Sequence, residues 1–180
     1  MTERDPSVPA GVREVLAVAQ GVLSDLDLEV VLERVVQAAR ELSGASYAAL
    51  GLLDRSRQNL ERFITVGIDQ PERGRIGAWP RGRGVLGELI VNPVPLRLAD
   101  IGTHPRFCGF PAEHPPMKTF LGVPVIAGGQ AFGNLYLTEK TGGEEFSEQD
   151  LEAVLALADL AGVAIDRARG VSDLEAQVPG

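Results

Sequence analysis

The chain has 180 residues, of which 44% are hydrophobic, and its formal net charge is −8 at pH 7. This length and apolar content suffice for one domain with a core of ordinary size, whereas the acidic excess argues against a surface for nucleic acid or anionic lipid. The single cysteine, Cys108, excludes an internal disulfide, and two histidines, His104 and His114, nearly exclude a structural zinc site.

Targeting and membrane signals are missing from the pattern of the sequence. Apolar stretches are interrupted by charges well before the roughly 20 residues that a membrane helix requires, and the start, MTERDPSVPAG, lacks the basic and apolar halves of a signal peptide. We therefore expect a cytoplasmic protein with a disordered leader over residues 1–10, one domain over residues 11–169 and a flexible tail over residues 170–180.

Two helices are predicted at the start of the domain. Residues 11–24 place their apolar side chains on one side of a helix, namely Val12, Val15, Leu16, Ala19, Val22 and Leu23. In residues 28–43 apolar side chains recur at the i, i+3 and i+4 positions, which is typical of an amphipathic helix. Asp25 and Asp27 offer caps for its start, and Gly44 stands where a terminal glycine belongs.

A β-hairpin should follow these helices. Residues 47–53 are small and apolar, residues 54–58 supply a turn, and residues 59–66 give the second strand. Residues 67–83 carry four glycines and two prolines, which indicates a loop with room for a short helical turn.

The middle of the chain has a short helix and an unusual loop. Residues 85–91 predict a helix that Asn92 and Pro93 stop, and residues 96–98 predict a short strand. Residues 100–118, DIGTHPRFCGFPAEHPPMK, contain four prolines, both histidines and the only cysteine, without a periodic pattern. A structureless loop of this length inside a domain is uncommon and is usually functional.

Two strands and a helix close the domain. Residues 120–127 and 131–138 flank Gly128-Gly129, a hairpin signal. The last helix starts at Ser147, with Asp150 placed for a capping box, and ends near Arg169. Its apolar side chains cover more than one face, so one part can pack on the sheet while another meets a second chain. Hairpin-joined strands with helices at both chain ends predict an α+β fold with a sheet covered on one face.

The stretch FLGVPVIAGGQAFGNLYLTEK, followed by EFSEQDLEAVLALADLAGVAIDRAR, resembles the closing half of GAF domains, and the resemblance covers about residues 12–169. It implies a central antiparallel sheet of five to six strands, with the N- and C-terminal helices packed on one face and a long loop on the ligand side. GAF domains are small-molecule sensor modules whose terminal helices often pair in a homodimer and pass a signal to an output domain such as a kinase.

A narrower resemblance concerns PLRLADIGTHPRFCGFPAEHPPMKTFLGVPV and FGNLYLTEK, which are similar to the first GAF domain of actinobacterial dormancy-response sensor kinases. Those domains bind haem b and sense oxygen, nitric oxide, carbon monoxide or redox state. The resemblance implies that His114 is the metal ligand and that Tyr136 is the distal residue. The chain departs from the haem-binding members at Gly51–Asp54, which is less polar here, and at Trp79, where some members carry histidine.

The residues themselves allow this chemistry and leave alternatives open. Two prolines after His114 restrain the backbone and lower the entropy cost of holding an imidazole for haem iron. His114 could instead be an exposed loop residue without a ligand role. Tyr136 could instead be a core residue whose hydroxyl bonds to a backbone carbonyl. An apolar pocket would be lined by aromatic and sulfur-bearing side chains, which are Phe63, Phe110, Met117, Phe120 and Phe132. We expect Tyr136, Asn134 and Phe132 to share one strand face.

Other motifs suggest other ligands or other ligand-binding residues. His104 is the second candidate ligand, and Cys108 is read as an ordinary thiol. Residues 82–87 match G-x-G-x-x-G but follow a loop, which disfavours a dinucleotide site. Lys140, Phe146 and Asp150 match part of the pattern of cyclic-nucleotide GAF domains. No catalytic constellation stands out, so we do not expect an enzyme. The resemblance implies a haem-based sensor. The alternatives are a haem-free dimerisation or interaction module and a sensor of another small ligand, such as a cyclic nucleotide.

Overall fold

Helices and strands occupy most of the chain that the computed structural model describes, which comprises residues 10–24, 27–57, 59–68, 84–110, 114–143 and 145–176. In chain order the elements are α1 (Ala10–Leu23), α2 (Leu28–Ser43), β1 (Ala45–Leu53), β2 (Leu60–Val66), α4 (Gly84–Val91), β3 (Leu96–Leu98), a 3-10 turn (Ile101–Thr103), β4 (Phe120–Ala127), β5 (Gln130–Lys140) and α5 (Glu148–Ala176).

The helix α2 forms where the periodicity predicted it. The side chain of Asp27 accepts a hydrogen bond from the Glu29 N–H and caps the start, while Gly44 ends the helix in the left-handed conformation at φ 66°. The buried side chains recur on one face of the helix, and they are Val31, Leu32, Val35, Val36, Ala38 and Ala39. The amphipathic pattern therefore turns one apolar face of α2 toward the sheet.

The five strands form one sheet in the order β2-β1-β5-β4-β3, and all neighbouring pairs are antiparallel. β4 and β5 are joined by Gly128 and Gly129, at φ 54° and 76°. Two consecutive positive φ angles are what a tight hairpin turn requires, and glycine adopts them without steric cost. The sequence-based prediction of an α+β fold with an antiparallel sheet is confirmed.

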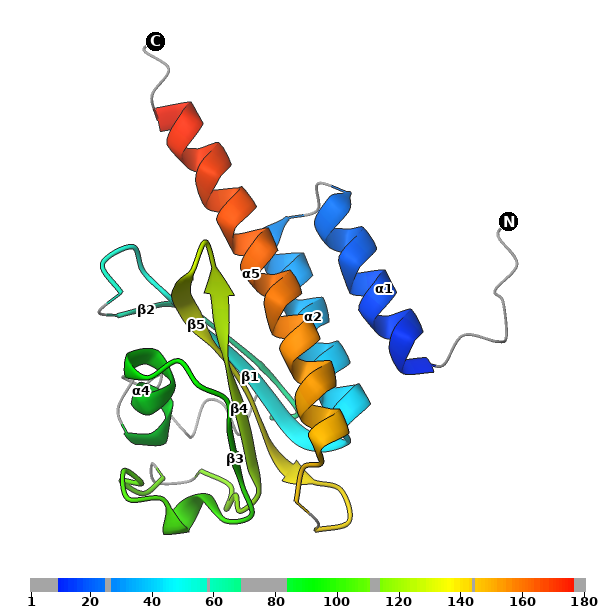
Figure 1. The fold of residues 1–180 in the computed structure, drawn as a ribbon, viewed down its shortest axis with the longest axis vertical. Helices are drawn as coiled ribbons and strands as arrows, with labels where there is room; N and C mark the ends of the chain where they lie inside the picture. The colour runs from blue at the N-terminus through cyan, green and yellow to red at the C-terminus, as the bar shows by residue number, and fades with distance from the viewer. Residues whose placement is uncertain are drawn as a thin grey trace.

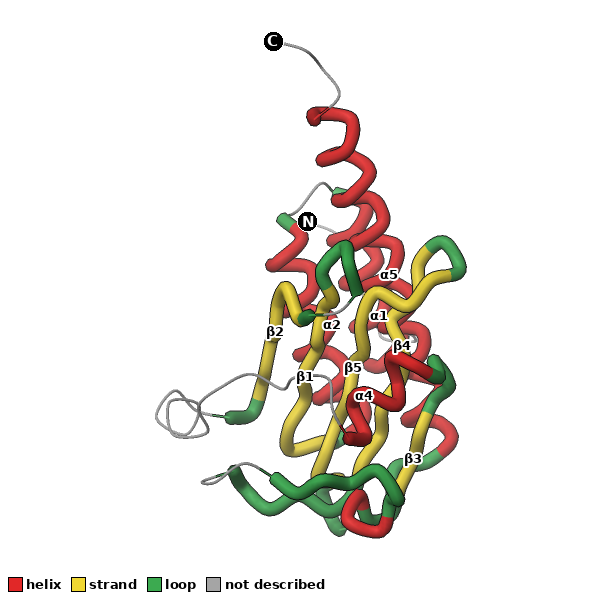
Figure 2. Tube along the Cα trace, turned by 90° about the vertical axis from the view of Figure 1, so that its left-hand side faces the viewer, coloured by secondary structure: helices red, strands yellow, loops and turns green. Residues whose placement is uncertain are grey.

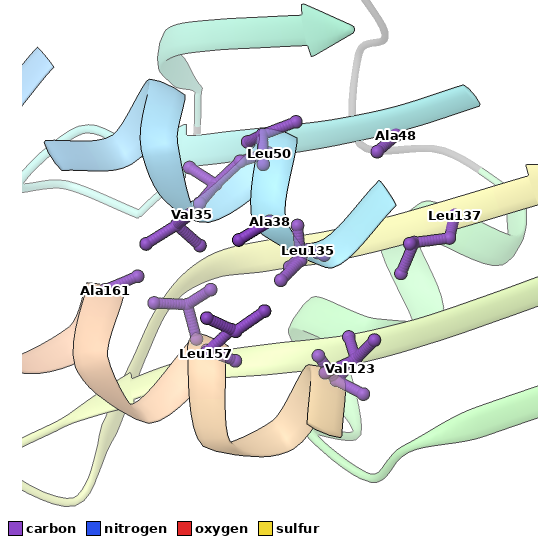
Figure 3. Packing of buried hydrophobic residues seen from close by; sticks show 14 of the residues in the cluster. Val35, Ala38, Ala48, Leu50, Val123, Leu135, Leu137, Leu157 and Ala161 are labelled. Carbon is purple, nitrogen blue, oxygen red and sulfur yellow. The ribbon is translucent and has the colours of Figure 1, made fainter. Parts of the chain in front are cut away.

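Three helices and one short helix lie on opposite faces of the sheet. α2 and α5 cover one face and α1 packs against them from outside, whereas α4 and the loops on either side of β3 lie on the other (Figure 1). The main core fills the space between the long helices and the sheet. Figure 3 shows Leu50 of β1 and Leu135 of β5 meeting Val35 of α2 and Leu157 of α5, all of which are fully buried. Each such side chain stabilises the fold by about 1.5–3 kcal/mol relative to its exposed state.

The buried face of α1 differs from the predicted one. Val18 is 3% exposed, whereas Val12 and Leu16 are 48% and 52% exposed. Because α1 carries apolar residues on several sides, the sequence pattern alone does not select a face. The contact with α2 and α5 selects it.

The last helix is longer than predicted. α5 continues to Ala176, past Arg169, where the apolar pattern ends, so the prediction of a flexible tail from residue 170 is wrong as far as residue 176. The predicted leader lies outside the described residues except for Ala10, which begins α1. Within the described helices, no segment combines the length and apolar character that crossing a bilayer requires.

Candidate ligand site

A small apolar cluster lies on the sheet face opposite the long helices. The buried residues are Val85 and Leu89 of α4, Ile101 of the 3-10 turn and Phe120 of β4. Tyr136 of β5 packs against them. Figure 2 shows α4 in front of β4 and β5, with loops below it. One helix of eight residues therefore covers this face together with irregular loops, in contrast to the longer helices α2 and α5 on the other face.

Small residues flank Tyr136 in the sheet. Tyr136 lies opposite Ala49 of β1 and Gly122 of β4 in the strand register. A Cβ on Gly122 would lie 2.5 Å from Leu89 Cδ1. The glycine therefore lets α4 approach the sheet, and the small neighbours leave the phenol ring as the largest side chain in its row.

The Tyr136 ring lies between two other aromatic rings. The ring centroids of Phe63 and Phe120 are 6.4 and 6.2 Å from that of Tyr136. Desolvation by burial raises the pKa of the phenol far above its ordinary value, so the hydroxyl stays protonated. The described residues provide no hydrogen-bond partner for this hydroxyl, so among them it does not meet the backbone carbonyl expected of a core tyrosine. Tyr136 therefore offers a donor to a ligand.

His114 lies in the segment that leads into β4. Its Nδ1 is 2.8 Å from the carbonyl oxygen of Pro115. A carbonyl oxygen only accepts, so in the neutral ring Nδ1 carries the proton and Nε2 keeps its lone pair. The ring also stacks on Phe110, with centroids 4.9 Å apart and planes inclined by 11°. Stacking covers the face of the imidazole, whereas the Nε2 lone pair lies in the ring plane and stays uncovered by Phe110.

His104 has the opposite arrangement. Its Nδ1 accepts a hydrogen bond from the Arg106 N–H at 3.3 Å. The neutral ring therefore carries its proton on Nε2 and has no free lone pair. His104 also ends the 3-10 turn, where its N–H bonds to the Ile101 carbonyl. The hydrogen bonds of the two histidines thus favour His114 over His104 as a metal ligand.

Two contacts join the His114 region to the sheet. The Thr138 hydroxyl donates to Met117 Sδ at 3.0 Å, and Thr138 lies on the same face of β5 as Tyr136, two residues away. Phe107 meets Phe110 edge-on, with centroids 5.2 Å apart, and packs against the small cluster. Met117 and Phe110 are therefore placed on the side of the sheet that carries Tyr136.

Phe132 does not lie on that side, and its predicted place beside Tyr136 is wrong. Ala131 pairs with Ile126 and Gly133 with Val125, so Phe132 is an extra residue in β5. This β-bulge breaks the alternation of side chains. The Phe132 ring packs against the main core and lies 4.5 Å from the Arg169 guanidinium of α5.

A groove whose lining includes neither His114 nor Phe132 lies at the edge of the sheet. It has a volume of about 500 Å³ and runs between α2 and β2. Of the predicted pocket residues, Phe63 lines this groove. The other lining residues come from α2 and β2, and they are Glu29, Val30, Glu33, Arg34, Gln37, Ile64, Thr65 and Val66. The groove is therefore a feature separate from His114.

The glycine-rich motif serves packing at the start of α4. Gly84 has φ 66°, and a Cβ there would lie 2.8 Å from Cys108 Sγ. Cys108 is exposed, and Arg106 Nε lies 2.6 Å from Glu88 Oε2. The loop of residues 104–110 is thus held against α4. The beginning of the motif, like Trp79 and most of the loop 67–83, lies outside the described residues.

Lys140, Phe146 and Asp150 come together at the start of α5. Lys140 Nζ donates to Asp150 Oδ2 and to the Ser43 carbonyl, both at 2.7 Å, and lies 5.8 Å from the Phe146 ring centroid. Desolvation opposes ionisation of Asp150, but hydrogen bonds from Lys140 and Ser147 outweigh it and lower the pKa of the carboxyl. Because the ammonium is already bonded within the fold, this pattern does not favour phosphate binding by Lys140.

Sequence reasoning placed Asn134 on this face but missed its bonding role. The carboxamide of Asn134 is buried and donates to the Leu86 carbonyl of α4 at 3.3 Å. A polar residue in the middle of an apolar strand was the available signal, since a buried amide needs a partner. Asn134 therefore ties α4 to the floor of the site.

Comparison with known proteins places the fold. The family model described as GAF domain matches residues 25–166. The chain belongs to the GAF family. The structure is similar to the GAF domain of a phosphoenolpyruvate-protein phosphotransferase from Coxiella burnetii, with TM-score 0.73, 26% identity and coverage of 89% of this chain and 96% of that one.

Two further solved structures share the GAF fold at lower identity. The GAF domain of the Acinetobacter phosphoenolpyruvate-protein phosphotransferase has TM-score 0.75 and 21% identity, over 91% of this chain and 97% of that one. Residues 122 to 287 of a methyl-accepting chemotaxis protein have TM-score 0.65 and 18% identity, over 83% and 95%. In this GAF domain the face under α4 gathers Tyr136, Asn134 and the residues around His114.

Proposed function

We propose that this GAF domain is a sensor that binds a small ligand on the α4 face of its sheet and signals to an output partner without catalysing a reaction. We propose that the domain holds haem b as a cofactor, with His114 as the ligand of its iron. The haem would sense a diatomic gas or the redox state. The observation that carries the proposal is the hydrogen bond from Nδ1 of His114 to the Pro115 carbonyl. It leaves Nε2 unprotonated, with a lone pair that can bind iron.

The donor set fits a haem better than a bare metal ion. Within the described residues, no group of three or more His, Cys, Asp or Glu side chains could hold an ion. A porphyrin brings four nitrogen ligands of its own and needs one strong ligand from the protein. A bond from the other ring nitrogen to a carbonyl fixes the orientation of such a histidine and increases its basicity. The haem would supply the iron at which a gas binds or an electron is gained.

Tyr136 supplies the second element of the proposal. Its protonated hydroxyl, without a partner among the described residues, suits a donor to a bound gas molecule or a bridging water. The rings of Phe63 and Phe120 hold the phenol in place. Exclusion of water by such rings strengthens a hydrogen bond to the ligand.

The output side of the proposal concerns the helices at the two ends of the chain. Val12 and Leu16 of α1 and Val163 of α5 are 48%, 52% and 56% exposed, and α1 packs against α5. We propose that this apolar surface pairs with a second copy and that a kinase or another signalling protein is the output. The likeness to a fragment of a methyl-accepting chemotaxis protein supports a place in signalling.

Titration with hemin (ferric protoporphyrin IX) tests the haem assignment. The wild type should give a sharp Soret band that saturates at about one hemin per chain, as expected for a single axial ligand. His114→Ala should abolish or shift this band, whereas the matched variant His104→Ala should leave it unchanged. A wild type that leaves hemin free, or a His114→Ala variant that behaves like the wild type, would overturn the assignment.

A second function, a haem-free interaction module, is favoured by the packing under α4. Leu89 and Phe120 are 0% and 1% exposed, so α4 must shift before a porphyrin can enter between it and the sheet. Under this alternative hemin stays free, and the protein still forms a dimer that Leu16→Glu disrupts. Hemin titration separates the two functions, whereas sedimentation equilibrium of the wild type and of this variant tests the dimer that both share.

A further inference from the structure

The residues after His114 are bonded to the end of β5 in a regular way. We call residues 114–119 the His114 segment. Three consecutive residues of this segment meet three consecutive residues of β5, in the pairs Met117–Thr138, Lys118–Glu139 and Thr119–Lys140. In the third pair the Lys140 N–H donates to Thr119 Oγ1 at 2.8 Å, and Thr119 is buried. A shift of the His114 segment therefore acts on the end of β5.

Glu139 occupies a strained conformation at this junction. Its φ of 57° lies in the left-handed region, which residues other than glycine rarely adopt. Two bonds to the His114 segment hold it there: its N–H donates to the Thr119 carbonyl at 3.2 Å, and its carboxylate accepts from the Lys118 N–H. A strained residue persists where its surroundings impose the conformation, so Glu139 is sensitive to the position of the segment.

The next residue, Lys140, reaches two helices. Its ammonium donates to the carbonyl of Ser43, the last residue of α2, and to Asp150 in the first turn of α5, both at 2.7 Å. The Lys140 and Asp150 side chains are 22% and 9% exposed, and an ion pair shielded from water is strong and geometrically defined. Asp150 Oδ2 also accepts from the Ser147 N–H at 2.7 Å, so Lys140 bonds the group that caps α5.

We propose that Glu139 and Lys140 form a coupling element through which displacement of the His114 segment changes the stability of the first turn of α5. The proposal rests on the proposed function for the origin of the displacement, which is occupancy at His114. α5 packs against α2 and continues to Ala176. A change at its first turn is thus passed to a helix that leads away from the sheet (Figure 1).

A second anchor of α5 provides an internal control. Arg97 of β3 donates to the Phe146 carbonyl at 2.9 Å and to Glu148 at 2.6 Å. Arg97 therefore connects the first turn of α5 to β3, whereas the bonds of the His114 segment connect the same turn to β5. Loss of the Arg97–Glu148 pair should therefore loosen the turn without affecting its response to the His114 segment.

Hydrogen exchange of the full chain, without added ligand, tests the coupling. Glu139→Ala removes the acceptor of the Lys118 N–H and leaves the backbone strain in place. It should raise exchange of the amides of residues 150–152, the first hydrogen-bonded amides of α5, by about tenfold, the factor expected for losing a charge-assisted hydrogen bond. In a Lys140→Met background, which keeps the stem and removes the charge, Glu139→Ala should add no further increase. In a Glu148→Gln background the full increase should remain.

Two results would overturn the coupling: exchange of residues 150–152 that does not change in Glu139→Ala, or an increase of the same size in the Lys140→Met background. Amides of β1 and β5 in the main core report global unfolding, and their exchange should stay constant across the series. Hemin titration of the same variants separates the two proposals. Coupling without hemin binding would refute the haem assignment alone, whereas hemin binding without coupling would refute the coupling alone.

Discussion

The two faces of the sheet are built on different principles. On the helix face, side chains from α2, α5 and three strands interlock, and Leu32, Val35, Leu135 and Leu157 have no exposed surface. On the α4 face a cluster of four buried residues lies beside the Tyr136 hydroxyl and the His114 Nε2, for which the described residues provide no hydrogen-bond partner. Apolar packing stabilises the first face. On the second face, polar groups suited to the ligand that we propose take the place of apolar packing, at a cost in stability.

The largest expected difference between the faces concerns loss of a buried leucine. Leu157 on the helix face and Leu89 on the α4 face are both fully buried. Leu157→Ala should lower the free energy of unfolding by about 3 kcal/mol, because the surrounding helices and strands cannot close the cavity. Leu89→Ala should cost about half as much, because α4 is short and can settle toward the sheet.

Denaturant unfolding of the wild type and the two variants measures this difference. Equal losses for Leu157→Ala and Leu89→Ala would show that the α4 face is packed as rigidly as the helix face. The contrast on which the site assignment relies would then be wrong.

The next effect concerns the close approach of α5 to the sheet. A Cβ on Gly162 would lie 2.1 Å from the backbone oxygen of Ile126 in β4, whereas a Cβ on Gly170 would have no atom within 4 Å. Gly162→Ala should therefore destabilise by about 2 kcal/mol through overpacking. The matched Gly170→Ala should stabilise by about 0.5–1 kcal/mol through helix propensity. Thermal unfolding of both variants checks the pair, and a neutral Gly162→Ala would contradict the packing.

Parts of the fold that depend on residues close in the chain could be predicted from the sequence, whereas parts that depend on distant contacts could not. Local signals placed α2, its caps at Asp27 and Gly44, and the turn at Gly128, because each depends on residues close in the chain. The buried face of α1 and the turn of Phe132 toward the main core were not predictable. The first depends on contact with distant helices, and the second on one extra residue in β5 that only the pairing with β4 reveals. Likewise His114 and Tyr136 were identified by resemblance, whereas the bonds around Glu139 join residues about twenty positions apart.

A smaller effect concerns how the stability that the Lys140–Asp150 ion pair gives to the start of α5 depends on pH. The pKa of Asp150 is lowered in the folded protein. Its ionised interactions therefore stabilise the fold fully above the pKa of the unfolded chain, about 4, and are lost as the pH falls through the lower folded value. Asp150→Asn should cost about 1 kcal/mol at neutral pH, as expected for a lost helix cap. This difference from the wild type should shrink below about pH 4.

Urea unfolding of both proteins between neutral and acidic pH measures that dependence. A difference that stays constant, or that grows as the pH falls, would contradict the ionised Lys140–Asp150 pair. Because the pair belongs to the helix face, the same acidification should leave the contacts of Tyr136 with Phe63 and Phe120 unchanged.

The smallest expected change in stability is the one that most sharply separates a ligand site from a core. Tyr136→Phe removes a hydroxyl that has no partner among the described residues and keeps the ring between Phe63 and Phe120. The free energy of unfolding of the ligand-free protein should stay constant or rise by at most about 1 kcal/mol, because no hydrogen bond is lost and a desolvated polar group is removed. The same variant should release carbon monoxide or oxygen faster than the wild type once hemin is bound and reduced. A clear loss of stability in Tyr136→Phe, with unchanged gas release, would make Tyr136 an ordinary structural tyrosine.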